Sequence, residues 1–159
     1  MGPAGSFHSA RRLVKCRTKF RTSPWGTSVT HAAITGWGKC LPPNVLTNAD
    51  LATFLDTNDE WITSRTGISE RRISHVSLEE MAYVSSMRAL AAAGLDPADV
   101  ELIVIGTCSF DDQVPNQASG LQVRLGAKRA AAYDVNTACT SFLYALSTAN
   151  ALIRTGVVK

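Results

Sequence analysis

The sequence predicts an α/β fold with a mainly parallel sheet. Residues 102–105 form a continuous run rich in β-branched side chains, which is typical of a strand covered on both faces. Residues 131–135 predict a second, short buried strand. Helical signals lie before, between and after these strands, and this alternation of strand and helix indicates that the strands run parallel.

The last predicted helix, over residues 139–155, indicates how the layers are arranged. Residues 139–153 contain no charged side chain, and the positions that would face solvent are small or neutral. A helix without a charged face is normally buried on all sides. A chain of 159 residues cannot easily supply that much cover. We therefore interpret residues 29–159 as the N-terminal half of a larger layered domain.

The region before residue 70 predicts one strand and two short helices. Residues 29–38 alternate small and apolar side chains, which predicts a strand that Pro42 and Pro43 end, because proline lacks a donor for the ladder. Short helices are expected over 48–55 and 59–65. Their signals are Thr47 with Asp50 at the start of the first helix and Gly67 after the second.

A longer helix is predicted after Ser77. Ser77 and Glu80 have the spacing of a capping box, in which the serine caps the helix and the glutamate reaches back to the cap. Gly94 ends this helix, and Asp96 and Pro97 prevent its continuation. The helix presents one face of small and apolar residues: Leu78, Met81, Ala82, Ser85, Ala89 and Ala92.

The rest of the chain continues the alternation. Pro115 lies where the first turn of another helix is expected, and Gly126 lies where that helix would end. The helix over 139–155 ends near Gly156. Residues 157–159 then resemble the beginning of a further strand, so the pattern is expected to continue past residue 159.

Composition and charge are typical of a soluble globular protein. The hydrophobic content is 45% and the charged content 18%, and no apolar run reaches the roughly 18 residues of a membrane span. Residues 1–49 carry seven Lys or Arg and no acid, whereas residues 50–159 carry nine basic and thirteen acidic side chains. The excess positive charge therefore belongs to the front of the chain, where no recognition motif is found. We expect neither a nucleic-acid nor a membrane partner.

Residues 1–28 predict a basic extension outside the fold. They mix Arg, Ser, Thr, Gly and Pro without sustained periodicity. We favour a disordered extension or a misplaced start codon over a transit peptide to a plastid or mitochondrion, because composition alone supports the transit peptide.

The cysteines favour a cytoplasmic protein without a metal site. The chain contains four: Cys16, Cys40, Cys108 and Cys139. They form no C-x-x-C pair and have no metal-ligand spacing. Reduced thiols in the cytoplasm are the simplest explanation.

Cys139 is the strongest candidate for a catalytic residue. It follows the predicted strand over 131–135 and a tight turn, and it opens the uncharged helix. The positive end of a helix dipole favours the thiolate form of a cysteine, which is the form that attacks acyl groups. The alternative is a buried cysteine that acts as a small hydrophobic residue. The strand–turn–helix context favours the nucleophile.

Trp61 and Arg65 are candidates for ligand binding. They are four residues apart, so they share one face of the predicted helix over 59–65. An aromatic plane and a guanidinium on one face can hold a purine ring by stacking and cation–π attraction. The alternative is a core tryptophan beside an arginine in a surface salt bridge, and the spacing alone favours this alternative.

Three stretches of the sequence carry a more specific pattern. They are Asn48-Ala49-Asp50-Leu51, then Asp56-Thr57-Asn58-Asp59-Glu60-Trp61-Ile62 with Arg65-Thr66-Gly67-Ile68, and finally Asp134-Val135-Asn136-Thr137-Ala138-Cys139 with Phe142. Together they resemble the 3-oxoacyl-acyl-carrier-protein synthase III family, the condensing enzymes that initiate type II fatty acid synthesis. The second stretch is the most specific, whereas thiolase-like enzymes share the third more loosely. The resemblance runs from about residue 34 to residue 159.

The resemblance implies a thiolase-like fold of two similar halves, with the nucleophile helix in the central layer. It implies a decarboxylating condensation, in which an acyl group passes from coenzyme A to Cys139 and then joins malonyl-acyl carrier protein. Acyl-CoA is then a substrate, no resident cofactor is expected, and the protein is expected to be a homodimer.

The resemblance also implies binding residues. Thr57, Trp61 and Arg65 match positions that contact the adenine of coenzyme A. Val114 and Pro115 match a loop that crosses the dimer interface and lines the acyl pocket of the other subunit. Some members have a large aromatic residue where Val114 stands, so we expect room for a longer or branched primer.

Two features of this chain differ from the complete family pattern. Members commonly have glycine where Ser141 stands, and serine adds modest bulk and can form a local hydrogen bond. The family's histidine and asparagine, which support decarboxylation and stabilise the thioester oxyanion, lie beyond the equivalent of residue 159. We therefore expect the chain alone to be inactive in condensation.

Two alternative functions remain open at this point. One is a relative that builds polyketide or quinolone-type thioesters, or that acylates an alcohol or amine. The other is a non-catalytic module for acyl-CoA binding or subunit assembly, although the retention of Cys139 argues against it.

Overall fold

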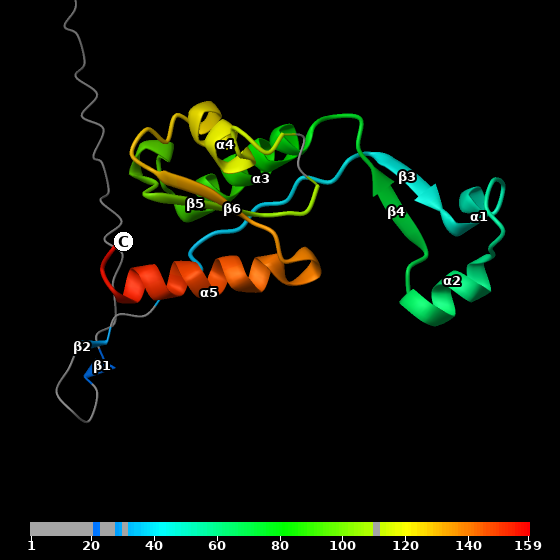
Figure 1. Ribbon diagram of the computed structural model, residues 1–159, viewed down its shortest axis with the longest axis horizontal. Helices are drawn as coiled ribbons and strands as arrows, with labels where there is room; N and C mark the ends of the chain where they lie inside the picture. The colour runs from blue at the N-terminus through cyan, green and yellow to red at the C-terminus, as the bar shows by residue number, and fades with distance from the viewer. Residues whose placement is uncertain (1–20, 23–27, 30–31, 110–111) are drawn as a thin grey trace, which may run out of the picture.

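The computed structural model describes residues 21–22, 28–29, 32–109 and 112–159. The strands are β1 (Arg21–Thr22), β2 (Ser28–Val29), β3 (Asn44–Thr47), β4 (Glu70–Ile73), β5 (Leu102–Gly106) and β6 (Ala131–Val135). The helices are α1 (Asn48–Leu51), α2 (Asp59–Thr66), α3 (Leu78–Ala93), α4 (Gln117–Leu125) and α5 (Ser141–Arg154), with 3-10 turns at Pro97–Asp99 and Ala138–Thr140. Figure 1 shows a central unit of β5, β6, α3, α4 and α5, and an arm of β3, β4, α1 and α2.

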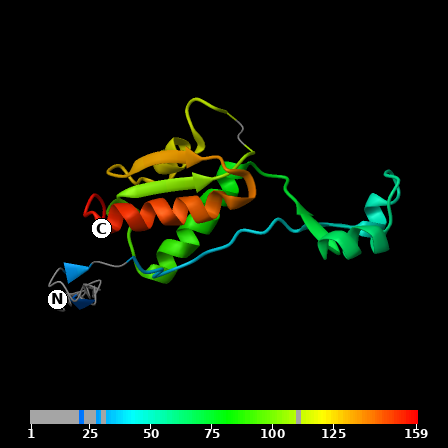
Figure 2. The same ribbon diagram turned by 60° about the horizontal axis from the view of Figure 1, so that its bottom comes forward.

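The central unit is built on the parallel pair of β5 and β6. Leu102 lies opposite Ala131 and Gly106 opposite Val135. A parallel pair needs a crossover connection, and α4 provides it. Helices α3 and α4 lie on one face of the pair and α5 on the other (Figures 1 and 2). The two central strands, their parallel direction and the layered α/β class are all confirmed.

The core lies between the β5–β6 pair and the helices α3 and α4. Its buried members are Ile103, Ala118, Leu121, Leu125, Ala127 and Ala130. Ala82, Tyr83 and Leu90 of α3 pack against this cluster. Of these three, only Ala82 belongs to the face that the periodicity predicted for α3.

The segment before β3 crosses α3 instead of forming the strand predicted over 29–38. In the described part of that range, only the first residue lies in a strand, β2. Gly36 and Gly38 allow the crossing, since a Cβ atom on them would lie 2.5 Å and 2.2 Å from backbone oxygens of α3. Arg88 Nη1 also donates a hydrogen bond to the Lys39 carbonyl at 2.6 Å. The small residues of this segment therefore allow contact with α3 instead of pairing in a sheet.

Local capping signals set the ends of the helices. The Ser77 hydroxyl accepts a hydrogen bond from the Glu80 backbone N–H at 3.1 Å, as predicted. The Glu80 side chain does not close the capping box, because it pairs with Arg124 of α4 and so joins the two helices. Helices α2, α3 and α4 each end at a glycine with a left-handed backbone: Gly67 (φ 70°), Gly94 (φ 67°) and Gly126 (φ 74°).

The arm contains an antiparallel strand pair that the periodicity did not predict. β3 and β4 pair from Asn44 opposite Ile73 to Thr47 opposite Glu70. β4 contains two adjacent arginines, so neither a continuous apolar run nor strict alternation marks it as a strand.

Helix α1 is shorter than the predicted range 48–55, but its predicted start is confirmed. The Thr47 side chain and backbone both donate hydrogen bonds to the Asp50 carboxylate, and Thr47 Oγ1 accepts from the Asp50 N–H. The hydrogen bond from the Thr47 side chain, followed by that from its backbone, lowers the pKa of Asp50 below its usual 3.8. The cap therefore contributes to stability at neutral pH, and the contribution is lost as the pH falls through that lowered pKa.

The two ends of the chain differ from expectation in different ways. The predicted extension over 1–28 lies mostly outside the described residues, and β1 and β2 pair antiparallel across Arg21 and Val29. The strand predicted at 157–159 is wrong, because these residues form no strand. The chain turns back after α5, and the Lys159 N–H donates to the Glu101 carboxylate at 2.8 Å. Among the described residues, no helix has the length and apolar character to cross a bilayer.

Candidate functional site

Cys139 lies in the connection between β6 and α5. The chain leaves β6 at Val135, forms the 3-10 turn Ala138–Thr140 and enters α5 at Ser141. The cysteine is exposed in this turn, two residues before the α-helix that it was predicted to open. The predicted strand–turn–helix context is present. The thiol lies beside a helix that the described elements cover on one face only, so its exposure does not by itself distinguish a nucleophile from a structural cysteine.

The residue before the cysteine has a strained backbone. Ala138 has a φ of 49°, in the left-handed region that residues with a Cβ atom rarely adopt. This conformation costs about 1–2 kcal/mol and persists only where surrounding contacts impose it. A strained turn is also typical of strand-to-helix elbows that present a nucleophile at the surface. Ala138 therefore supports the interpretation of Cys139 as a nucleophile.

Contacts on both sides of the turn fix its position. The Thr137 carbonyl accepts hydrogen bonds from the Thr140 N–H at 3.2 Å and from Thr140 Oγ1 at 2.7 Å. Gly106, the last residue of β5, lies so close to α5 that a Cβ atom on it would be 2.9 Å from Ser141 Cβ. The end of β5 therefore contacts the start of α5, two residues after Cys139.

Helix α5 is covered on one face only within the described chain. It packs against β5 and β6, but Phe142 is 68% exposed, and Leu143, Tyr144 and Leu146 are exposed as well. This open face agrees with the expectation that a chain of this length cannot cover the helix on all sides. The reason is that the described elements cover α5 from the sheet side alone (Figures 1 and 2).

Trp61 and Arg65 share one face of α2, as their spacing predicts. The Arg65 guanidinium carbon lies 4.9 Å from the centroid of the Trp61 ring, within the range of a cation–π contact. Trp61 is 55% exposed, so it is not a core tryptophan. Within the described residues Arg65 forms no ion pair. Neither half of the structural alternative is found among the described residues, but the guanidinium lies over the Trp61 ring itself, so a planar ring does not fit between the two groups in this arrangement.

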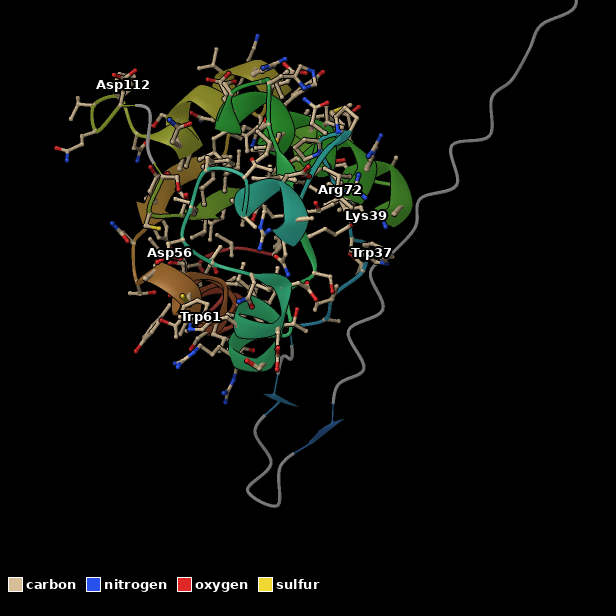
Figure 3. The ribbon with its side chains drawn as sticks, turned by 90° about the vertical axis from the view of Figure 1, so that its right-hand side faces the viewer. Trp37, Lys39, Asp56, Trp61, Arg72 and Asp112 are labelled. Carbon is tan, nitrogen blue, oxygen red and sulfur yellow. The ribbon has the colours of Figure 1, made fainter. Side chains whose placement is uncertain are left out.

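A cavity of about 590 Å³ adjoins Trp61. Its walls are Leu51, Leu55, Asp56, Thr57, Asn58, Trp61 and Ile62. Figure 3 shows Trp61 and Asp56 on the same side of the arm, opposite to Trp37 and Arg72. Thr57, the third residue implied to contact coenzyme A, lines the cavity, and its hydroxyl is buried without a hydrogen-bond partner among the described residues. A buried hydroxyl without a partner is costly, which is consistent with a site where a ligand or a small rearrangement supplies one.

Asn48 fixes α2 within the arm. It is 1% exposed. Its amide donates to Asp59 Oδ1 at 2.7 Å and to the Ile68 carbonyl at 2.8 Å, and its oxygen accepts from Arg71 Nη1 at 2.9 Å. One side chain thus joins the start of α2, the turn after it and β4. Since Trp61 lies on α2, this network sets the direction of the face it shares with Arg65.

The structure places the 114–115 loop and the cysteine turn at the same edge of the sheet, but not α2. Val114 and Pro115 lie in the connection from β5 to α4, and Cys139 lies in the connection after β6. Parallel neighbours end at one edge, where the Thr107 N–H donates to the Val135 carbonyl at 3.1 Å. Helix α2 lies at the far end of the arm, away from the start of α5, in both Figure 1 and Figure 2.

Asp134 joins the end of β6 to the start of α4 at this edge. Its carboxylate accepts hydrogen bonds from the N–H groups of Gln117 at 2.9 Å and Ala118 at 2.8 Å, at the start of α4. The positive end of a helix dipole favours a negative charge there. Asn116 is the N-cap of α4, so Pro115 lies just before the cap and not in the first turn as predicted.

Sequence reasoning named Asp134, Asn48 and Ala138 only as members of the family pattern and assigned a structural role to none of them. An acid inside an apolar strand was a usable signal for Asp134, because a buried carboxylate needs hydrogen-bond partners. Asn48 follows a helix cap and carries no comparable signal. The left-handed backbone of Ala138 has no signal either, because glycine is the residue that usually marks such a conformation.

Comparisons with known proteins support the predicted family resemblance. The family model described as 3-oxoacyl-[acyl-carrier-protein (ACP)] synthase III matches residues 133–159. A beta-ketoacyl-[acyl-carrier-protein] synthase III 2 from Vibrio vulnificus is 54% identical over 129 residues, which are 81% of this chain and 36% of that protein. Over most of its length the chain is similar to 3-oxoacyl-[acyl-carrier-protein] synthase III proteins. The predicted resemblance is thereby confirmed.

Solved structures of similar proteins confirm the thiolase-like α/β fold. The 3-oxoacyl-[acyl-carrier-protein] synthase III of Aquifex aeolicus has a TM-score of 0.75 and 44% identity, over 77% of this chain and 40% of that one. The priming β-ketosynthase of the R1128 polyketide pathway has a TM-score of 0.74 and 34% identity, over 77% and 37% of the two chains. The chain thus spans less than half the length of these synthase III relatives.

We predict that Asn48→Ala loosens the arm while the central unit stays intact. Leaving Asp59 and Arg71 without their buried partner should cost about 1–3 kcal/mol. Hydrogen exchange should become faster in α2 and β4 but not in β5 or β6. Asn44→Ala, at an exposed position of β3, is the matched control and should change exchange little. Unchanged exchange in α2 would contradict the assignment of Asn48.

Proposed function

We propose that this chain supplies the acyl-accepting part of a 3-oxoacyl-[acyl-carrier-protein] synthase III. In the first step the Cys139 thiolate attacks the carbonyl carbon of an acyl-CoA, and coenzyme A leaves as its thiol after taking up a proton. In the second step malonyl-acyl carrier protein loses carbon dioxide, and the resulting carbanion attacks the acyl-cysteine and releases the Cys139 thiolate. The observation that carries the proposal is the exposed Cys139 beside strained Ala138 in the elbow between β6 and α5.

The start of α5 supports the proposed chemistry. Thr140, at the N-cap of this helix, makes no side-chain capping bond. The first N–H groups of a helix lack intrahelical partners and carry partial positive charge. The Ser141 N–H already donates to the Ala138 carbonyl, so the N–H groups that follow it are the ones proposed to favour a thiolate at Cys139 or the negative charge that develops during acyl transfer.

Coenzyme A recognition is proposed for the Trp61–Arg65 face of α2. The exposed ring, the guanidinium 4.9 Å from its centroid and the adjoining cavity with Thr57 form a surface that suits an adenine ring. Such a contact is worth about 0.5–2 kcal/mol. Because α2 is separate from the cysteine turn, this face is proposed to hold the nucleotide end of the ligand and not its reacting thioester.

The remaining features of the enzyme are also proposals. A homodimer, in which the loop of Val114 and Pro115 reaches the acyl pocket of the other subunit, follows the family pattern. Malonyl-acyl carrier protein is the proposed acceptor, and the cytoplasm the proposed location. Since the decarboxylating histidine and asparagine are expected beyond residue 159, residues 1–159 alone should support at most the acylation step.

A second candidate is the same condensation with a different acceptor. The similarity to the R1128 priming β-ketosynthase, at 34% identity and a TM-score of 0.74, favours it specifically. Both candidates use Cys139 identically, so the primer and the carrier protein distinguish them. Assays that compare malonyl-loaded carrier proteins from fatty acid and polyketide synthesis would decide between them.

We predict that incubation with acyl-CoA adds one acyl group to Cys139. Intact-mass spectrometry on the 159-residue chain, and on any longer reading frame that contains it, should show the adduct. Cys139→Ala should abolish it, whereas Cys108→Ala, which removes another exposed thiol, should retain it. The absence of an adduct with any acyl-CoA would contradict the proposal and favour a non-catalytic acyl-CoA-binding module.

We predict that Trp61→Ala and Arg65→Ala each weaken acyl-CoA use. The KM for acyl-CoA in the acylation assay should rise about three- to thirtyfold, because one stacking or cation–π contact is lost. Acylation by a thioester without the nucleotide, such as an acyl-pantetheine, should not change. Trp37→Ala removes a tryptophan that is 72% exposed and lies elsewhere, so it is the control. An equal effect on both thioesters would count against adenine recognition.

We predict that Val114→Phe narrows primer choice in the complete protein. The larger ring should reduce activity on medium-chain acyl-CoA about tenfold relative to acetyl-CoA, because it fills the space for the chain. Val123→Phe, at an exposed position of α4, is the control. Equal losses on short and longer primers would discard this role for Val114.

A further inference from the structure

We propose that Ser141 is a positioning residue that holds the turn of Cys139 in its reactive geometry. The proposal rests on the proposed role of Cys139 as the acyl acceptor. Ser141 acts through the backbone of the turn and not by contact with the acyl group. It is the residue at which this chain departs from the glycine that is common in the family.

The first argument is the buried hydroxyl of Ser141. Ser141 is the first residue of α5 and is 3% exposed. Its Oγ accepts a hydrogen bond from the Thr137 N–H at 2.9 Å, and Thr137 Oγ1 is a second, weaker donor at 3.4 Å. Thr137 itself is exposed, so this hydrogen bond ties the exposed turn to a buried hydroxyl and stabilises the turn as it stands.

The second argument is the position of the strain. Thr137 and Ser141 flank the 3-10 turn, so the hydrogen bond between them spans Ala138 with its φ of 49°. A strained residue keeps its conformation only where surrounding contacts impose it. Without the Ser141 hydroxyl, Ala138 is free to relax to a negative φ, and the direction of the Cys139 side chain changes with it.

The third argument is the support from β5. A Cβ atom on residue 106 would lie 2.9 Å from Ser141 Cβ, so the end of β5 and Ser141 can lie this close together only because residue 106 is a glycine. Its hydroxyl is therefore held in place relative to the sheet edge. The hydrogen bond from Thr137 to this hydroxyl therefore also fixes the turn. A glycine at position 141 has no hydroxyl and could not form this hydrogen bond.

The test compares the alkylation rates of Cys139 and Cys108 in the same sample. Both thiols are exposed, so Cys108 serves as the internal reference. Iodoacetamide labelling from pH 6 to 9, followed by peptide mass spectrometry, gives the ratio of the two rates. Ser141→Ala should lower this ratio about five- to tenfold, the effect of losing one hydrogen bond. Ser147→Ala, on an exposed part of α5, should leave it unchanged.

A rescue variant separates positioning from general stability. Glycine adopts a positive φ without cost, so Ala138→Gly in the Ser141→Ala background should restore most of the lost ratio. An unchanged or increased ratio in Ser141→Ala, or no recovery on adding Ala138→Gly, would overturn the proposal. If Ser141→Ala does not fold by circular dichroism, Ser141→Gly, which also removes the hydroxyl, is measured in its place with the same criteria.

Failure of this inference is distinguishable from failure of the proposed function. An acyl adduct on Cys139 together with an unchanged alkylation ratio in Ser141→Ala would retain the enzyme and reject the positioning role. If no acyl adduct forms, but Ser141→Ala lowers the alkylation ratio and Ala138→Gly restores it, the proposed enzymatic function is rejected. The role of Ser141 in positioning the turn is then retained.

Discussion

The parallel pairing of β5 with β6 determines where the candidate site lies. Because neighbouring parallel strands end at the same edge, the loop before α4 and the turn before α5 both leave the sheet there. Asp134 reinforces this geometry by joining the end of β6 to the first N–H groups of α4. Gly106 does the same on the other face, where the end of β5 meets the first turn of α5. The strained turn at Ala138 lies between these contacts, at the same edge of the sheet.

The two faces of this sheet differ in burial, and the proposed nucleophile lies on the less buried side. The face toward α3 and α4 carries the buried apolar cluster. The opposite face carries α5, whose outer side chains remain exposed although the helix has no charge before Arg154. The proposed nucleophile thus lies at the end of the least covered helix of the central unit. The arm is stabilised differently. The hydrogen bonds of the buried Asn48 hold it together in place of an apolar core.

The local elements and the chemistry of the candidate residues could be predicted from the order of the amino acids. Ser77 and Thr47 mark helix starts, and Gly67, Gly94 and Gly126 mark helix ends, because capping depends on residues close in the chain. The apolar run at 102–105 identified a central strand in the same way. Cys139, and the pair Trp61 and Arg65, were found from their spacing and from the family pattern. The proposed role of Cys139 requires only a turn, and the proposed role of Trp61 and Arg65 requires only one face of a helix.

The contacts that hold those elements together became visible only in the folded molecule. Residues 32–38 of the strand expected over 29–38 are instead a segment packed on α3, since the two glycines there make helix contact as easy as sheet pairing. Glu80 pairs with Arg124 and not with its own cap because α4 brings an arginine near. Asn48 and Asp134 act through residues more than ten positions away in the chain. Such contacts leave no local periodicity, because they depend on which surfaces meet after the chain has folded.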